Sequence, residues 1–118
     1  MNDLSKAWDG VLVRKWLESR VEAARLDQAI ADKQGYSAQA DYDKAAAEEW
    51  VCQGLRTVAG KDQPAFIARL KQLLDQDDYT ITGIYDDRRF ERYVRATLRK
   101  IATMAKANEG FENTLRYQ

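Results

Sequence analysis

Five cationic side chains recur at spacings that place them along one side of a helix. We call them the cationic face, and they are Arg88, Arg92, Arg95, Arg99 and Lys106. At 100° per residue they project within about 60° of one direction, nearly opposite the apolar residues of the same segment. Most are arginines, whose planar guanidinium suits bidentate contacts to carboxylate or phosphate. Residues 86–106 hold seven bases and three acids, so the rest of this net-neutral chain carries a compensating charge of −4.

Three interpretations of the cationic face compete. The first is an ordinary solvated surface that pairs with the acidic residues of the second predicted helix, which are Asp41, Asp43, Glu48 and Glu49. The second is contact with an acidic patch on another protein. The third is contact with nucleic-acid phosphates. We rank the third below the second, because no aromatic residue interleaves the cations for base stacking and no nucleic-acid-binding signature accompanies them. The zero net charge also argues against a protein built to coat nucleic acid.

An apolar and aromatic segment precedes the cationic face. Tyr79, Ile81 and Tyr85 flank Gly83 in a run rich in β-branched and aromatic residues, which favours an extended connection over a helix. If these three side chains are exposed, they are apolar anchors beside the cations. The alternative is burial under the neighbouring helices.

The residue types of the usual catalytic centres are missing. The chain has no histidine, which removes histidine triads, histidine-ligated zinc and the usual acid–base group at neutral pH. The single cysteine, Cys52, lies among apolar neighbours and is expected to be a small buried hydrophobe. No glycine-rich phosphate loop occurs, and no pair of carboxylates stands out. We therefore expect a non-enzymatic protein without a cofactor.

An acidic stretch between two predicted helices has the length of a calcium-binding loop. Counting from Asp75, position 3 is Asp77 and position 12 is Asp86. However, Thr80 stands at position 6, where such loops need glycine, and position 12 offers the shorter aspartate. We expect no metal site here, and interpret these acids as solvating the loop and capping its neighbours.

Composition and length predict one globular domain spanning residues 1–118. Apolar residues make up 45% of the chain and charged residues 32%. No apolar run approaches the ~20 residues that span a bilayer, and Asp3 and Asp9 make the N-terminal stretch unlike a signal peptide. With one cysteine and no disulfide, the expected location is the cytoplasm.

Hydrophobic periodicity predicts an all-α fold: four main helices in a compact bundle with a long N-terminal helix. The helices are expected at about 3–34, 38–59, 63–75 and 87–107, with a tail at 108–118 and an irregular or short extended connection near 78–86. Ser37, Asp62 and Asp86 or Asp87 are candidate helix caps, and Gly35 and Gly60 are candidate ends.

The first predicted helix carries two apolar stripes. One contains Leu12, Trp16, Ser19, Ala23, Leu26 and Ile30, and the other contains Val13, Leu17, Val21 and Ala24. Arg20 and Asp27 lie between the stripes, which indicates either a polar seam between two packed neighbours or partly buried, paired charges. The second stripe is also a candidate homodimer surface.

These observations predict a non-catalytic protein-interaction protein. A small inhibitor, such as a phage-encoded counter-defence protein or an antitoxin or immunity protein, is a typical function for a small helical chain without catalytic motifs. The predicted contact residues are the cationic face and the three anchors. The alternative function is that of a nucleic-acid-binding accessory protein that uses the same face.

Overall fold

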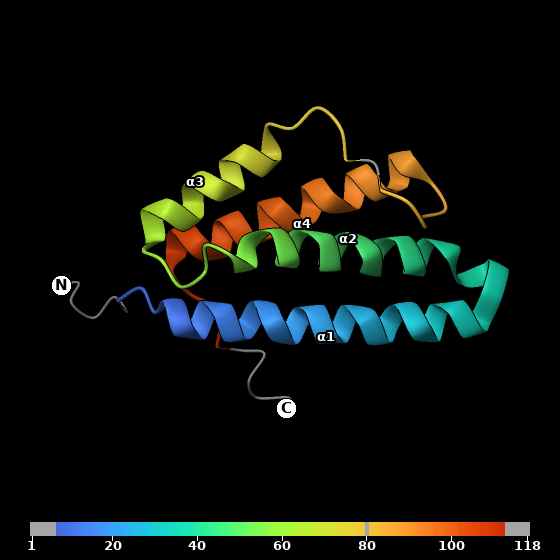
Figure 1. The fold of residues 1–118 in the computed structure, drawn as a ribbon, viewed down its shortest axis with the longest axis horizontal. Helices are drawn as coiled ribbons and strands as arrows, with labels where there is room; N and C mark the ends of the chain where they lie inside the picture. Colours follow the sequence, from blue (N-terminus) through green and yellow to red (C-terminus); the bar gives the residue numbers. More distant parts are fainter. Residues whose placement is uncertain (1–6, 80, 113–118) are drawn as a thin grey trace.

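The computed structural model describes residues 7–79 and 81–112, and over these residues the chain is mostly helical with no strand. The elements are α1 (Gly10–Gln34), the short 3-10 helix η2 (Gly35–Ala38), α2 (Gln39–Arg56), α3 (Gln63–Leu74) and α4 (Asp87–Ala107) (Figure 1). The predicted all-α class is therefore confirmed for the described part of the chain. The segment between α3 and α4 is irregular where it is described.

The first helix begins later than predicted, because Asp9 caps it. Its carboxylate accepts hydrogen bonds from the N–H groups of Val11 and Leu12 at 3.0 and 3.1 Å, which satisfies donors that have no partner inside the helix. Residues 7–9 are not helical, and residues 1–6 lie outside the described part. At the other end Gly35 has a φ of 76°, and the prediction that this glycine ends the helix is confirmed.

The predicted cap of the second helix is wrong. Ser37 lies inside η2, and α2 begins at Gln39 with no side-chain cap bond at Ala38. A 3-10 turn continues directly into the α-helix, so no separate cap is needed. The helix also ends at Arg56, before the predicted Ala59, and residues 57–60 form a turn.

The last two helices begin where their caps predict. The Asp62 carboxylate accepts from the N–H of Ala65 at 3.0 Å at the start of α3. The Asp86 carboxylate accepts from the N–H of Arg89 at 3.0 Å at the start of α4. These bonds give both acids a structural role. Asn108 ends α4 in the left-handed conformation.

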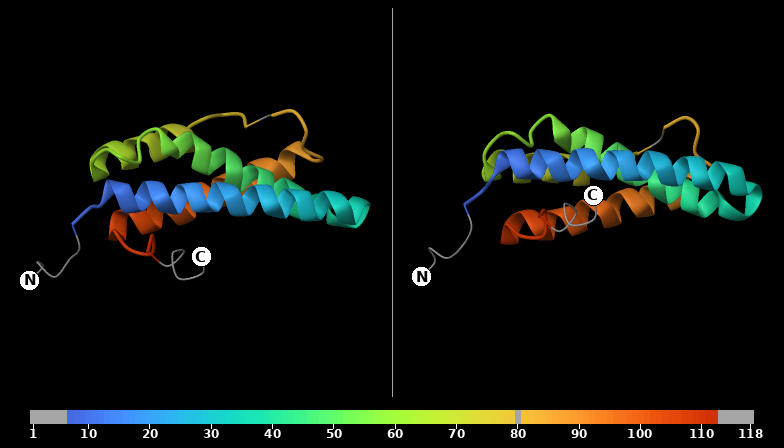
Figure 2. Two further views of the ribbon diagram at one scale, coloured as in Figure 1. Left: turned by 60° about the horizontal axis from the view of Figure 1, so that its bottom comes forward. Right: turned by 90° about the horizontal axis from the view of Figure 1, so that it is seen from below.

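Three pairwise helix contacts organise the molecule. α1 packs against α2, α2 against α4, and α3 against α4, whereas α1 and α4 make no extensive contact with each other. The two further views show α1 and α4 on neighbouring sides of α2 (Figure 2). The largest fully buried hydrophobic side chains come from every α-helix and from the segment after α4: Val13, Leu17, Val51, Leu55, Phe66, Leu70, Phe90, Val94, Leu98, Ile101 and Phe111.

The second stripe of α1 is part of this core and is not a homodimer surface. Val13, Leu17, Val21 and Ala24 are each 2% exposed or less. α2 runs along this stripe, so the predicted free surface does not exist. The partly exposed stripe is the first one, where Leu26 is 62% and Ile30 47% exposed.

An aromatic cluster closes the end of the molecule where α1 begins. Phe111 lies edge-on to Trp16, with ring centroids 5.4 Å apart, and to Trp8 at 5.9 Å. Trp8 also contacts Phe66 at 5.4 Å, and its indole N–H donates to the carbonyl of Lys61 at 2.9 Å. Phe111 therefore docks the start of the predicted tail onto α1, whereas residues 113–118 lie outside the described part of the chain.

A buried carboxylate on α2 holds the start of α4. Asp43 is 0% exposed and accepts from the N–H groups of Tyr85 and Asp86 at 2.8 and 3.0 Å. It also accepts from Nε and Nη2 of Arg89 at 3.1 and 2.9 Å. A buried charge is tolerated when it is paired and hydrogen-bonded to this extent. Asp43 therefore fixes the end of the irregular connection and the first turn of α4 onto α2.

We expect Asp43→Asn to destabilise the protein by about 3 kcal/mol, because the amide cannot accept all four bonds and removes the charge that faces Arg89. Urea unfolding followed by circular dichroism measures the loss. Asp41→Asn is the matched control, since Asp41 is an exposed acid on the same helix, and its effect should stay within about 0.5 kcal/mol. Equal effects of the two substitutions would contradict the anchoring role of Asp43.

Two helical glycines should respond in opposite directions to alanine. A Cβ on Gly10 would lie 2.8 Å from the carbonyl oxygen of Ala59, a backbone atom, whereas a Cβ on Gly54 would meet only the Leu73 side chain at 3.6 Å. We expect Gly10→Ala to destabilise by about 1 kcal/mol or more through this overlap. Gly54→Ala should stabilise by roughly 0.5–1 kcal/mol through helix propensity. Thermal unfolding of both variants measures the signs, and a stabilising Gly10→Ala would refute the close approach.

Candidate partner-binding surface

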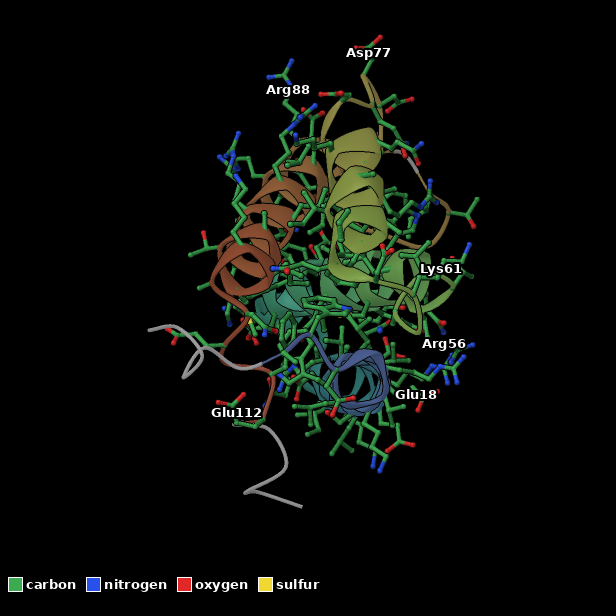
Figure 3. The ribbon with its side chains drawn as sticks, turned by 90° about the vertical axis from the view of Figure 1, so that its left-hand side faces the viewer. Glu18, Arg56, Lys61, Asp77, Arg88 and Glu112 are labelled. Atoms are coloured by element: carbon green, nitrogen blue, oxygen red, sulfur yellow. The ribbon has the colours of Figure 1, made fainter. Side chains whose placement is uncertain are left out.

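Most of the cationic face is exposed on the outer side of α4. Arg88, Arg92, Arg99 and Lys106 are exposed, and we call them the four free cations because none pairs with another described residue. Figure 3 shows Arg88 projecting away from α4 at the edge of the molecule. The opposite side of the helix is buried through residues such as Phe90, Val94 and Leu98. The four free cations therefore form one accessible surface.

Arg95 differs from the rest of the cationic face because the protein uses it internally. Its Nε donates to the Glu91 carboxylate at 3.1 Å, and its Nη atoms donate to the carbonyls of Leu74 and Gln76, also at 3.1 Å. The guanidinium lies over the ring of Tyr79, 4.9 Å from its centroid. Arg95 thus ties the end of α3 to α4, and all three of its guanidinium nitrogens are engaged inside the fold.

The three predicted anchors lie in different environments. Tyr79 is 3% exposed, its hydroxyl donates to the Leu73 carbonyl, and its ring lies 5.5 Å from that of Trp50, so it is a core residue. Burial raises the pKa of its phenol above the ordinary value. Ile81 is partly buried against the core. Tyr85 is 51% exposed with its ring edge-on to Tyr42, and it is the accessible member of the three.

Three of the four acids of α2 pair with residues outside the four free cations. Glu48 binds Arg20 of α1, and Glu49 binds Arg25 at 2.9 Å and Gln28 at 2.7 Å. Asp43 binds Arg89. The interpretation in which the acidic second helix neutralises the cationic face therefore fails for these three acids. Asp41 is exposed and is not paired with any described residue.

A groove of about 690 Å³ lies between α1 and α4 with α2 as its floor, and we call it the α1–α4 groove. Arg20 and Asp27, the two charges inside the apolar arc of α1, both line it. Arg20 forms a bidentate, partly buried pair with Glu48 at 2.8 and 3.0 Å, and this bonding raises its pKa above the ordinary value. Asp27 is exposed. Of the two interpretations, the partly buried, paired charge is confirmed for Arg20, whereas Asp27 lies exposed on the groove.

Sequence reasoning missed the α4 side of this groove. Tyr93, Ala96, Thr97 and Lys100 line it from α4, opposite the α1 residues. Their spacing of three and four residues follows one side of a helix, but mixed polar and apolar types hid this pattern. The charges inside the arc of α1 were the available signal.

Cys52 is fully buried in α2, and burial raises the pKa of its thiol to about 12. Since the thiolate is the nucleophilic form, burial disfavours nucleophilic chemistry at this cysteine. Among the residues that the structure describes, no group of three or more histidine, cysteine or acidic side chains is placed to hold a metal ion.

Comparisons with known proteins give no relative for this chain. Neither a protein-family model, nor a curated protein, nor a solved structure matches it. Within the described residues, no helix has the length and apolar character needed to cross a membrane.

We expect Cys52 to resist a thiol reagent until the protein unfolds. Reaction with Ellman's reagent at pH 8 should be roughly 100-fold slower in buffer than in 6 M guanidinium, because the buried thiol stays protonated and enclosed. Lys15→Cys adds a matched exposed thiol that should react at once. Rapid reaction of the native Cys52 would show that α2 opens easily.

Proposed function

We propose that this chain is a non-catalytic interaction protein that binds an acidic surface of another protein through the four free cations. The observation that carries the proposal concerns the described part of the chain. There Arg20, Arg25, Arg89 and Arg95 form ion pairs inside the fold, whereas Arg88, Arg92 and Arg99 form none with another described residue. Three exposed arginines on one rigid helix are preorganised for bidentate contacts with carboxylates.

The geometry of α4 gives this surface its reach. Arg88 and Lys106 are 18 residues apart, which corresponds to about 27 Å along a helix. Each exposed ion pair contributes only about 0.2–1 kcal/mol, so binding requires several simultaneous contacts. Tyr85, next to the first turn of α4, adds an exposed aromatic ring where a partner can bury apolar area. In this proposal the helices form one compact bundle, and α4 holds the four free cations in fixed positions on its surface.

The biological role that fits is inhibition by occupying an acidic surface. An inhibitor of this kind, as in counter-defence or antitoxin and immunity proteins, needs charge complementarity and no catalytic group. The proposal places both proteins in the cytoplasm. The second candidate is a nucleic-acid-binding accessory protein, which the same four cations would serve through phosphate contacts.

Charge reversal at Arg92 and Arg99 tests the proposal. We expect R92E/R99E to reduce recovery of a specific protein partner from native-host lysate by tenfold or more, because attraction becomes repulsion at the centre of the surface. The control R14E/K15E makes the same charge change on exposed positions of α1 and should retain the partner. Arg95 is left intact because its bonds hold α3 to α4. Equal recovery by the two double variants would refute the proposal.

The same variants separate the nucleic-acid alternative. A 20-base-pair duplex and a 20-nucleotide single strand, titrated by fluorescence anisotropy at several salt concentrations, report phosphate contacts directly. Our proposal expects no specific binding at 150 mM salt. Binding whose salt slope falls by about two units in R92E/R99E would instead assign the surface to nucleic acid.

A further inference from the structure

We propose that the α1–α4 groove binds an amphipathic helix of a partner protein. This helix would carry a basic residue and an acidic residue two to three turns apart beside its apolar stripe. The surface is distinct from the four free cations, and the inference does not depend on them.

The packing of the helices leaves room for one more. α1 and α4 each pack on α2 and make no extensive contact with each other (Figure 2, right). Residues of all three helices line the groove. On α1 its lining extends from Trp16 to Gln34. The 18 helical steps between these two residues span about 27 Å, which exceeds the length of a small molecule and matches roughly five turns of helix.

The apolar wall of the groove is covered along only part of α1. Trp16 is buried beneath Phe111, which follows α4 in the chain and packs on it at 5.4 Å. Further along α1, Ile30 also lines the groove and remains 47% exposed. The protein's own cover therefore ends partway, and a partner helix would continue it over Ile30.

Small side chains permit a helix to approach closely. Each of the three helices contributes one alanine to the lining, namely Ala31 of α1, Ala45 of α2 and Ala96 of α4. The distance between packed helices depends on the side chains at the contact, and alanines allow the shorter distances. Tyr93 stands on the α4 wall as an aromatic contact.

The charges of the groove specify the occupant. Arg20 and Glu48 neutralise each other. The end of the groove next to η2 carries a net negative charge, because it holds Asp27 and Asp41 but only one base, Lys44. The end near Arg20 carries the positive charge of Lys100. A base facing the two aspartates and an acid facing Lys100 would complement both ends, and a separation of about 10–16 Å corresponds to two to three helical turns.

A peptide-display library tests this proposal with a defined probe. Its members are 18-residue helices with a fixed leucine stripe, and with Lys, Glu or Ser at each flanking position. We expect selection on the native protein to enrich peptides with Lys near one end and Glu seven to eleven residues away. Versions of a selected peptide with two lysines or two glutamates should bind about tenfold more weakly, because one end then meets a like charge.

Protein variants locate the binding site. Ile30→Glu and Ala96→Glu each place a charge on the groove at an exposed position, and we expect each to weaken binding of the selected peptide at least tenfold. Ala29→Glu is the matched control, because Ala29 is an exposed neighbour that does not line the groove. Circular dichroism checks that all three variants remain helical.

The remaining outcomes separate this inference from the proposed function. R92E/R99E should leave peptide binding unchanged, and a loss there with retention in A96E would overturn the inference. The inference would also be overturned if selection on the native protein enriched no peptide more strongly than selection on the A96E variant. A concentration-dependent dimer in sedimentation that disappears in I30E would assign the groove to a second copy of the chain and refute a partner helix.

Discussion

The position of α4 depends on one buried carboxylate. Asp43 accepts two backbone N–H groups from the residues just before α4 and two side-chain N–H groups from its first turn. A side chain bonded to both the connection and the helix sets the start of α4 and its rotation about its own axis. Among the described residues α4 makes its extensive helix contacts with α2 and α3, and not with α1. The hydrogen bonds of Asp43 therefore determine which way the four free cations and the α4 side of the α1–α4 groove face.

The arginines of the chain divide into structural and free groups. Arg20 and Arg25 tie α1 to α2, Arg89 ties α4 to α2, and Arg95 ties the end of α3 to α4. A guanidinium group is suited to linking two helices because it donates hydrogen bonds in several directions at once. Arg95, for example, donates to one carboxylate and two carbonyls. Composition alone does not distinguish these residues from Arg92 or Arg99. The distinction comes from which face of each helix meets a neighbour.

The sequence predicted the elements better than their partners. Periodicity located each α-helix, and Asp62 and Asp86 marked starts correctly because capping is a local interaction. Local patterns could not show that Asp43 is buried, since its partners lie more than 40 residues away in the chain. For the same reason the two stripes of α1 looked equivalent. Only the position of α2 decides that Val13 and Leu17 are core while Leu26 and Ile30 are exposed.

The two candidate surfaces lie on different flanks of α4. Tyr93 and Lys100 face the α1–α4 groove, and they are displaced by roughly 100° around the helix from Arg92 and Arg99. The buried stripe of α4 is narrow enough to leave both flanks accessible, because the extensive contacts of α4 with described helices are those with α2 and α3. A single straight helix cannot contact both flanks at once. Binding at the groove and at the four free cations therefore requires either two partner segments or one partner that wraps around α4.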